Sequence, residues 1–171
     1  MKNALWESWE LVRSEYRRGR TNSERSLQAF LFRFLQDALP DHNVFCEPGV
    51  DVSDVRAIPD ILVVEDGSVV AAVELKFKPQ SYPVYEEDLR KLGYYGEHKE
   101  TFPLTLDPAT GRESLSRFRF ADDCLLVFAA IGRFDADAVD DSFLKSKMPV
   151  GLADRFIALT HQVRPASAVP G

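Results

Sequence analysis

Three ionisable residues, Asp60, Glu74 and Lys76, lie within two runs of sequence that otherwise have the composition of buried strands. Two carboxylates held side by side in a mostly apolar sheet repel each other and lose solvation, an arrangement that is costly unless a cation lies between them. Mg²⁺ prefers one or two carboxylates together with waters and substrate phosphate, and Asp60, Glu74 and the backbone carbonyl of Leu75 would supply such a set. Lys76 could hold or activate the attacking water and offset the charge that builds on the phosphate. The pattern therefore predicts hydrolysis of a phosphodiester bond.

The chemistry makes a demand on the register of the two strands. Side chains alternate along a strand, so Glu74 and Lys76 share one face. The Asp66-Gly67 dipeptide between the runs predicts a hairpin. A two-residue turn there sets Asp60 opposite Val73, on the wrong face. A three-residue turn, or a bulge in either strand, sets Asp60 opposite Glu74 instead, so the catalytic interpretation requires a register offset by one residue.

The remaining elements are expected from periodicity, capping and turn signals. We expect helices at 4–18, 21–38, 85–98 and 136–147, and strands at 44–47, 58–64, 69–77, 124–132 and 155–163. The stretch 101–120 reads as irregular, and 166–171 as a loose tail. Helices able to cover both faces of a central mixed sheet make α/β the natural class, in one domain that spans residues 1–165.

The motif and its surroundings resemble the PD-(D/E)xK nuclease superfamily, which has the restriction-endonuclease-like fold. The resemblance rests on Pro59-Asp60, then thirteen residues, then Glu74-Leu75-Lys76, and covers roughly residues 20–133. It implies an αβββαβ core, here with an extra N-terminal helix, and an endonuclease, a hydrolase that cleaves nucleic acid with Mg²⁺ or alternatively Mn²⁺. Asp60, Glu74 and Leu75 would be the metal ligands, with Lys76 beside the attacking water.

Glu24 has two interpretations. Many members of the superfamily carry one more acidic residue on the first core helix, and Glu24 fits that place as a further catalytic and metal-binding residue. Thr21-Asn22-Ser23-Glu24 also fits a capping box, in which Glu24 closes only the start of its helix.

Five basic residues are candidates for contacts with nucleic acid: Arg18, Arg20, Arg56, Arg90 and Lys91. Arg18 and Arg20 directly precede the Glu24 helix and so should lie at the rim of the site. Arg56 could meet a phosphate or pair with a nearby aspartate. Arg90 and Lys91 follow a run of acids at a spacing typical of intrahelical ion pairs, whereas in the superfamily this helix flanks the site. Nearby tyrosines suit core packing, or less commonly base stacking.

The net charge of −6 argues against a protein that coats nucleic acid through bulk charge, although a local basic strip is compatible with it. A partner protein or a homodimer could deliver the substrate, for which DNA is the first expectation. The longest apolar stretch is too short to cross a membrane, and two dispersed cysteines suggest buried thiols, so we expect a cytoplasmic protein. Two alternatives stay open: a non-catalytic module that binds nucleic acid or protein, and a hydrolase of small phosphoesters.

Overall fold

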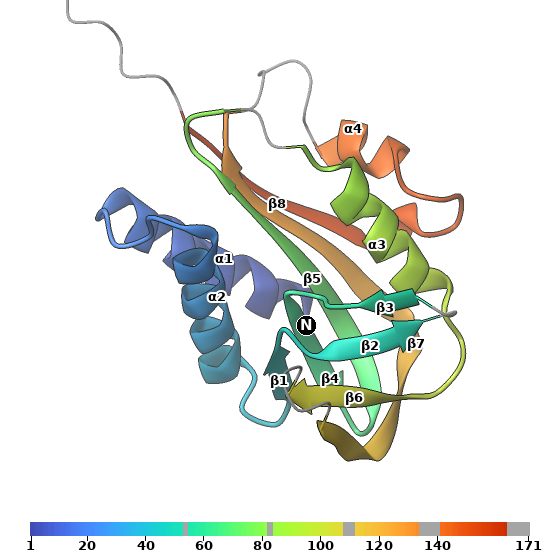
Figure 1. The fold of residues 1–171 in the computed structure, drawn as a ribbon. Helices are drawn as coiled ribbons and strands as arrows, with labels where there is room; N and C mark the ends of the chain where they lie inside the picture. The colour runs from blue at the N-terminus through green and yellow to red at the C-terminus, as the bar shows by residue number, and fades with distance from the viewer. Residues whose placement is uncertain (53–54, 82–83, 108–111, 134–140, 164–171) are drawn as a thin grey trace, which may run out of the picture.

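The computed structural model describes residues 1–171 except 53–54, 82–83, 108–111, 134–140 and 164–171 (Figure 1). The helices are α1 (Lys2–Arg17), α2 (Glu24–Ala38), α3 (Glu86–Glu97), α4 (Asp141–Ser146) and the 3-10 helix η1 (Ala153–Arg155). The strands are β1 (Asn43–Cys46), β2 (Gly49–Val52), β3 (Val55–Ala57), β4 (Ile61–Glu65), β5 (Ser68–Lys78), β6 (Phe102–Asp107), β7 (Arg112–Gly132) and β8 (Phe156–Gln162). The structure confirms a mixed α/β class.

The strands form one mixed sheet in the order β1-β4-β5-β7-β6-β2-β3, and β8 pairs with β7. The long strand β7 pairs with β6 through its first half, and through its second half it lies between β5 and β8. Both of the latter pairings are parallel, and they align Lys78 with Gly132 and Gly132 with Gln162. The carboxyl ends of β5, β7 and β8 therefore meet at one edge, the place where open α/β sheets bind ligands.

Helices cover both faces of the sheet, with α1 and α2 on one side and α3 and α4 on the other (Figure 1). Successive side chains of β5 point to opposite faces of the sheet, so they pack in different helical layers. Val73 and Leu75 pack in the cluster that holds α1 and α2, whereas Ala72 packs in the cluster that holds α3. Glu74 and Lys76 therefore project toward α3.

The β4–β5 hairpin has the register that the catalytic interpretation requires. Its turn has two residues, Asp66 and Gly67, both with positive φ (47° and 77°), and Glu65 pairs with Ser68 across it. The offset comes from a bulge: Val70 is an extra residue in β5, so Ile61 pairs with Val73. Continuing this register by one residue places Asp60 opposite Glu74.

Four sequence predictions need correction or fall partly or wholly outside the described residues. The capping box is real but lies two residues later than predicted, with Ser23 as N-cap and Ser26 as its partner, so Glu24 is the first helical residue. The described residues of the stretch 101–120 are not irregular, because 102–107 form β6 and 112–120 form the first part of β7. Phe102, Leu104, Phe118 and Phe120 are buried in the core, but Leu106 and Leu115 are exposed, which obscures the alternation of a strand in the sequence. The first part of the helix expected at 136–147 and the tail 166–171 lie outside the described residues. In the described part of the chain no helix is long and apolar enough to cross a membrane.

Candidate active site

β5 extends beyond the end of β4, and two carboxylates bind backbone N–H groups in the part of its edge that β4 leaves unpaired. In the antiparallel ladder β4 begins at Ile61, opposite Val73, so among the described residues the backbone N–H groups of β5 beyond that point have no strand partner on this side. Asp60 Oδ2 accepts a hydrogen bond from the N–H of Leu75 at 2.6 Å. Glu24 Oε2 accepts one from the N–H of Phe77 at 3.1 Å. Glu24 thus reaches from α2 to β5 and does not merely close its own helix.

Glu74 is the most buried acidic side chain of the site, with 1% of its surface exposed. The hydroxyl of Tyr95 donates to Oε1 at 3.1 Å, and the ammonium of Lys91 lies 3.3 Å from Oε2. Both partners come from α3, which packs over this part of β5. The carboxylate is therefore fixed in orientation from the helix side.

Lys76 is held by a second residue of the same helix. Its ammonium nitrogen lies 3.0 Å from Oδ2 of Asp88, whose side chain is almost completely buried. Asp88, Lys91 and Tyr95 are spaced by three and four residues, so they form one polar stripe on α3 that faces the alternating Glu74 and Lys76. Two ion pairs therefore cross the space between strand and helix.

The electrostatics of the two central acids reflect burial and mutual repulsion. Burial, with the nearby Asp60 as the next cause, raises the pKa of Glu74 to about 8. Burial also raises the pKa of Asp60 to about 6, against the opposing effect of its hydrogen bond from Leu75. Burial acts to lower the pKa of Lys76, but the pairing with Asp88 and the charges of Glu24 and Asp60 together outweigh it and raise that pKa. A cation near the two carboxylates would stabilise their ionised forms.

The donor set fits a hard divalent cation. Asp60 and Glu74 provide carboxylate oxygens, and the carbonyl of Leu75 lies on the same side of β5 as its N–H. Glu24 is close enough to act electrostatically on Asp60. Within the described residues no three acidic, histidine or cysteine side chains gather tightly enough to form a complete cage. A bound cation would therefore depend on two carboxylates, backbone oxygen and water, a combination that suits Mg²⁺.

The structure places the basic residues proposed for nucleic-acid contact in different environments. Arg18 and Arg20 both pair with the buried Glu15, at 2.9 and 3.0 Å, and keep most of their side-chain surface exposed. Lys91 points into the site. Arg90 does not: its guanidinium stacks on the ring of its helical neighbour Tyr94, 5.6 Å from the centroid. Arg56 belongs to β3, and its side chain lies outside the described residues.

Sequence reasoning missed Asp88 and Tyr95 as members of the site. The available signal was the polar stripe they form with Lys91 on a helix whose neighbouring positions, Leu89 and Leu92, are buried and apolar. From spacing alone, Asp88 and Lys91 indicate intrahelical pairing and Tyr95 indicates core packing, because spacing does not show which residues of β5 they face.

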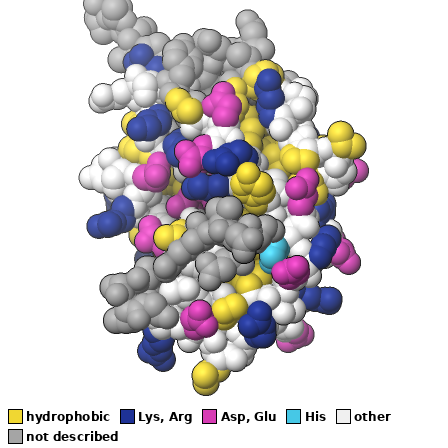
Figure 2. Space-filling model, turned by 45° about the vertical axis from the view of Figure 1, so that its right-hand side comes forward, with side chains coloured by type: hydrophobic (Ala, Val, Ile, Leu, Met, Phe, Trp, Pro, Cys, Tyr) yellow, Lys and Arg dark blue, Asp and Glu magenta, His cyan; other side chains and the backbone are white. Residues whose placement is uncertain are grey.

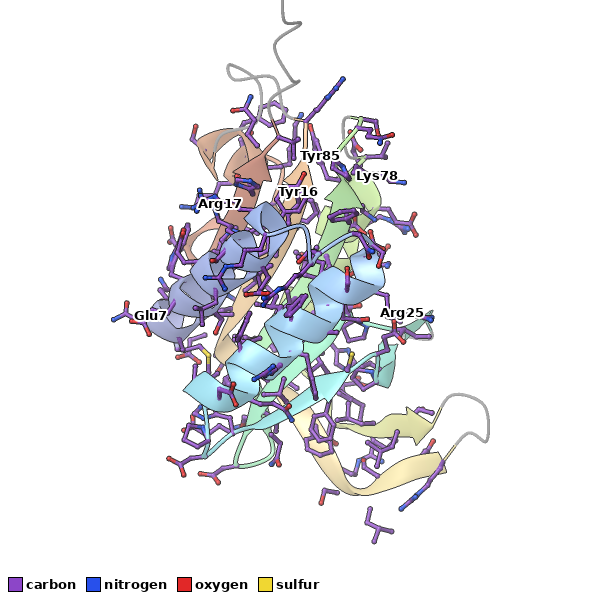
Figure 3. The ribbon with its side chains drawn as sticks, turned by 90° about the vertical axis from the view of Figure 1, so that its left-hand side faces the viewer. Glu7, Tyr16, Arg17, Arg25, Lys78 and Tyr85 are labelled. Carbon is purple, nitrogen blue, oxygen red and sulfur yellow. The ribbon has the colours of Figure 1, made fainter. Side chains whose placement is uncertain are left out.

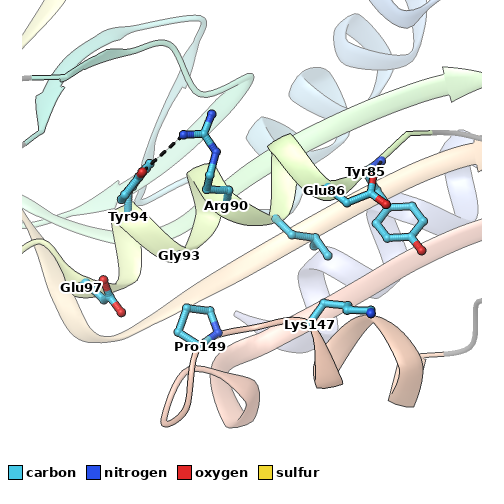
Figure 4. A pocket seen from close by; sticks show the side chains of 9 residues that line it. Tyr85, Glu86, Arg90, Gly93, Tyr94, Glu97, Lys147 and Pro149 are labelled. Atoms are coloured by element: carbon cyan, nitrogen blue, oxygen red, sulfur yellow. Dashed lines mark hydrogen bonds between the residues drawn. The ribbon is translucent and has the colours of Figure 1, made fainter.

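A separate groove of about 370 Å³ lies on the other side of α3 (Figure 4). It is lined by Tyr85, Glu86, Leu89, Arg90, Gly93, Tyr94, Glu97, Lys147 and Pro149. The helix presents a different set of residues to this groove than to Glu74, so the groove and the carboxylate cluster are distinct sites. On the face seen in Figure 2, acidic and basic side chains lie interspersed in the upper half and form no broad area of one sign.

The chain matches no protein-family model, no curated protein and no solved structure. Inference about its function therefore depends on the residues and geometry of the site.

Proposed function

We propose that this chain is a metal-dependent endonuclease that hydrolyses phosphodiester bonds of nucleic acid, with DNA as the first candidate substrate. The observation that carries the proposal is the register of β4 and β5, which brings Asp60 opposite Glu74 at the carboxyl end of β5. Asp60, Glu74 and the carbonyl of Leu75 would hold Mg²⁺ or Mn²⁺, with Glu24 beside them. The resemblance to the PD-(D/E)xK superfamily supports the same assignment.

We also propose that the fold contains the restriction-endonuclease-like core. The elements α2, β1, β4, β5, α3 and the second half of β7 follow one another in the order αβββαβ. Their strands are adjacent in the order β1-β4-β5-β7, the first three antiparallel and the last parallel to β5. In this assignment β2, β3 and β6 are additions to the core, and α1 is the extra N-terminal helix.

A divalent cation, when bound, supplies positive charge that polarises a phosphoryl oxygen and makes water a better nucleophile. The chain's own residues then have defined tasks. Tyr95 orients Glu74 through its hydrogen bond, and the N–H of Leu75 fixes Asp60. Preorganised groups of this kind need little reorganisation when charge develops on the phosphate.

The position of Lys76 supports a role in binding the substrate. It borders a hollow of about 410 Å³ lined by Lys76, Lys78, Ser81, Val84, Glu87 and Asp88. A phosphate that enters this hollow from the carboxyl edge of the sheet meets the ammonium of Lys76, which holds the attacking water and offsets negative charge. Asp88 positions that ammonium.

A cleavage assay tests the proposal directly. Labelled single- and double-stranded DNA and RNA are incubated with and without Mg²⁺, using wild-type protein, Asp60→Asn and the control Asp37→Asn. Asp37 lies on the exposed surface of α2, where it faces Arg33 at 3.8 Å, so its variant makes the same chemical change away from the site. We expect Mg²⁺-dependent cleavage by wild type and control and none by Asp60→Asn with unchanged circular dichroism. Equal cleavage by all three proteins would contradict the assignment of Asp60.

A second candidate is a non-catalytic module on the same scaffold that binds nucleic acid or a partner protein. The observation that favours it is Lys91, whose ammonium already gives Glu74 a counter-charge at 3.3 Å. Absence of Mg²⁺ and Mn²⁺ binding by calorimetry, together with absence of plasmid nicking, would select this candidate. The acidic net charge is compatible with a homodimer or partner protein that delivers substrate in either case.

A further inference from the structure

A second group of nitrogen-bearing side chains lies where the end of α1 meets the end of β8. The Nε of Arg13 lies 3.3 Å from Nδ1 of His161 and donates to it. The neutral imidazole therefore carries its own hydrogen on Nε2, the nitrogen that Arg13 does not occupy. The ring of Tyr16 packs edge-on against His161, with centroids 5.4 Å apart. These contacts fix the orientation of a half-buried histidine at the carboxyl edge of the sheet.

The positive charge of this corner is not fully neutralised. Burial, followed by the charges of Arg13 and Arg17, lowers the pKa of His161, with Glu10 acting weakly in the opposite direction. Arg13 also pairs with Glu10. Arg17 is exposed and has no ion-pair partner among the residues that the structure describes. An exposed guanidinium beside a fixed imidazole N–H attracts anions.

The corner is continuous with the candidate active site. Tyr16 contacts Phe77 as well as His161, with ring centroids 6.1 Å apart, and the N–H of Phe77 binds Glu24. Phe77 and His161 therefore lie within about 12 Å of each other. In Figure 3, Tyr16 lies between Arg17 on one side and Lys78, at the end of β5, on the other. Lys76 projects toward α3, so a strand bound there would have to cross this edge of the sheet to reach His161.

We propose that Arg13, Arg17 and His161 form a binding station for a backbone phosphate of the substrate strand, separate from the phosphate that is cleaved. The inference rests on the proposed function. Guanidinium and imidazole N–H groups donate to phosphate oxygens, and such contacts fix the register of a strand without reading its bases. Phe77 directly follows Lys76 in β5 and lies within about 12 Å of His161, so we expect the bound phosphate to be a few nucleotides from the cleaved bond.

Binding in EDTA separates this station from catalysis. The affinity for a labelled DNA duplex is measured over about 0.05–0.2 M KCl for wild type, Arg17→Gln and Arg33→Gln. Arg33 is an exposed arginine of α2 that faces Asp37, so its variant removes the same charge away from the corner. We expect Arg17→Gln to weaken binding several-fold and to reduce the slope of log affinity against log salt by about 0.9, and Arg33→Gln to change neither. Equal slopes for Arg17→Gln and wild type would overturn the station.

Neutral methylphosphonate linkages locate the contact. Placed singly at each position along one strand of a short duplex, one linkage should weaken binding by wild type but not by Arg17→Gln. Loss of the same size in both proteins at every position would also overturn the station. If no oligonucleotide is cleaved but Arg17→Gln shows both effects, the station stands and the nuclease proposal fails. If DNA is cleaved and Arg17→Gln binds like Arg33→Gln, the station fails and the nuclease proposal stands.

Discussion

Replacing Glu74 by glutamine tests the physical argument for a cation at the site. Glutamine has nearly the same shape as glutamate and can still accept the hydrogen bond from Tyr95, but it carries no charge. Lys91, which loses its partner, keeps 32% of its side chain exposed and can be solvated. In metal-free protein the variant therefore removes the energetic cost of a buried anion and little else.

The size of the expected change in stability follows from the raised pKa of Glu74. Glu74 has a pKa of about 8 in the folded protein against an ordinary value of 4.5, so between these pH values the folded state binds more protons than the unfolded state. Stability therefore falls as pH rises through this window. Each unit of pKa difference is worth about 1.4 kcal/mol, so the full loss approaches about 5 kcal/mol above the folded pKa. Asp60, Asp88, Lys91 and Tyr95 all act on Glu74, so the comparison is made between proteins that share them.

Urea unfolding in EDTA at about pH 5, 7 and 9 measures the effect. We expect Glu74→Gln to match wild type near pH 5 and to exceed its free energy of unfolding by a few kcal/mol near pH 9. Glu97→Gln, an exposed substitution on α3, is the matched control and should show no such widening gap. Added Mg²⁺ at about 100 times its Kd should recover about 2.7 kcal/mol in wild type and much less in Glu74→Gln.

A difference in unfolding free energy between Glu74→Gln and wild type that stays constant with pH would refute the reasoning. So would a variant less stable than wild type near pH 9 in EDTA. Either result would mean that the sheet and α3 tolerate the ionised Glu74 without a cation. The case for a metal site would then lose its physical basis.

Two further predictions concern α3 and the cysteines. Asp88→Asn leaves Lys76 without the carboxylate that pairs with it. In the cleavage assay kcat should therefore fall about 10–100-fold with KM little changed. An unchanged kcat would show that Asp88 has no part in the mechanism. Burial raises the pKa of Cys124 to about 12, whereas Cys46 is exposed. A thiol reagent at neutral pH should therefore modify only Cys46 in the folded chain and both cysteines in urea. Rapid modification of both thiols in the folded protein, read by mass spectrometry, would show that β7 opens readily.

Local patterns in the sequence were sufficient to identify the candidate acids and the lysine on the hairpin. The turn at Asp66-Gly67 and the alternation through Glu74 and Lys76 depend on near neighbours in the chain, so they can be read before folding is known. The same holds for most helices, whose apolar stripes and caps are local. The catalytic interpretation required a register offset, but the position of the bulge at Val70 is not visible in the sequence, because a bulge depends on pairing with the neighbouring strands.

The sequence by itself determined the acids, the lysine and the α/β order of elements, because side-chain alternation, turn chemistry and helical periodicity are properties of short segments. Only the tertiary structure decided what these residues face. Asp88, Lys91 and Tyr95 meet Glu74 and Lys76 because α3 packs across β5, and Glu24 binds the N–H of Phe77 because β4 ends early enough to leave that group without a strand partner. Contacts between residues distant in the chain arise from packing, and no local pattern encodes them.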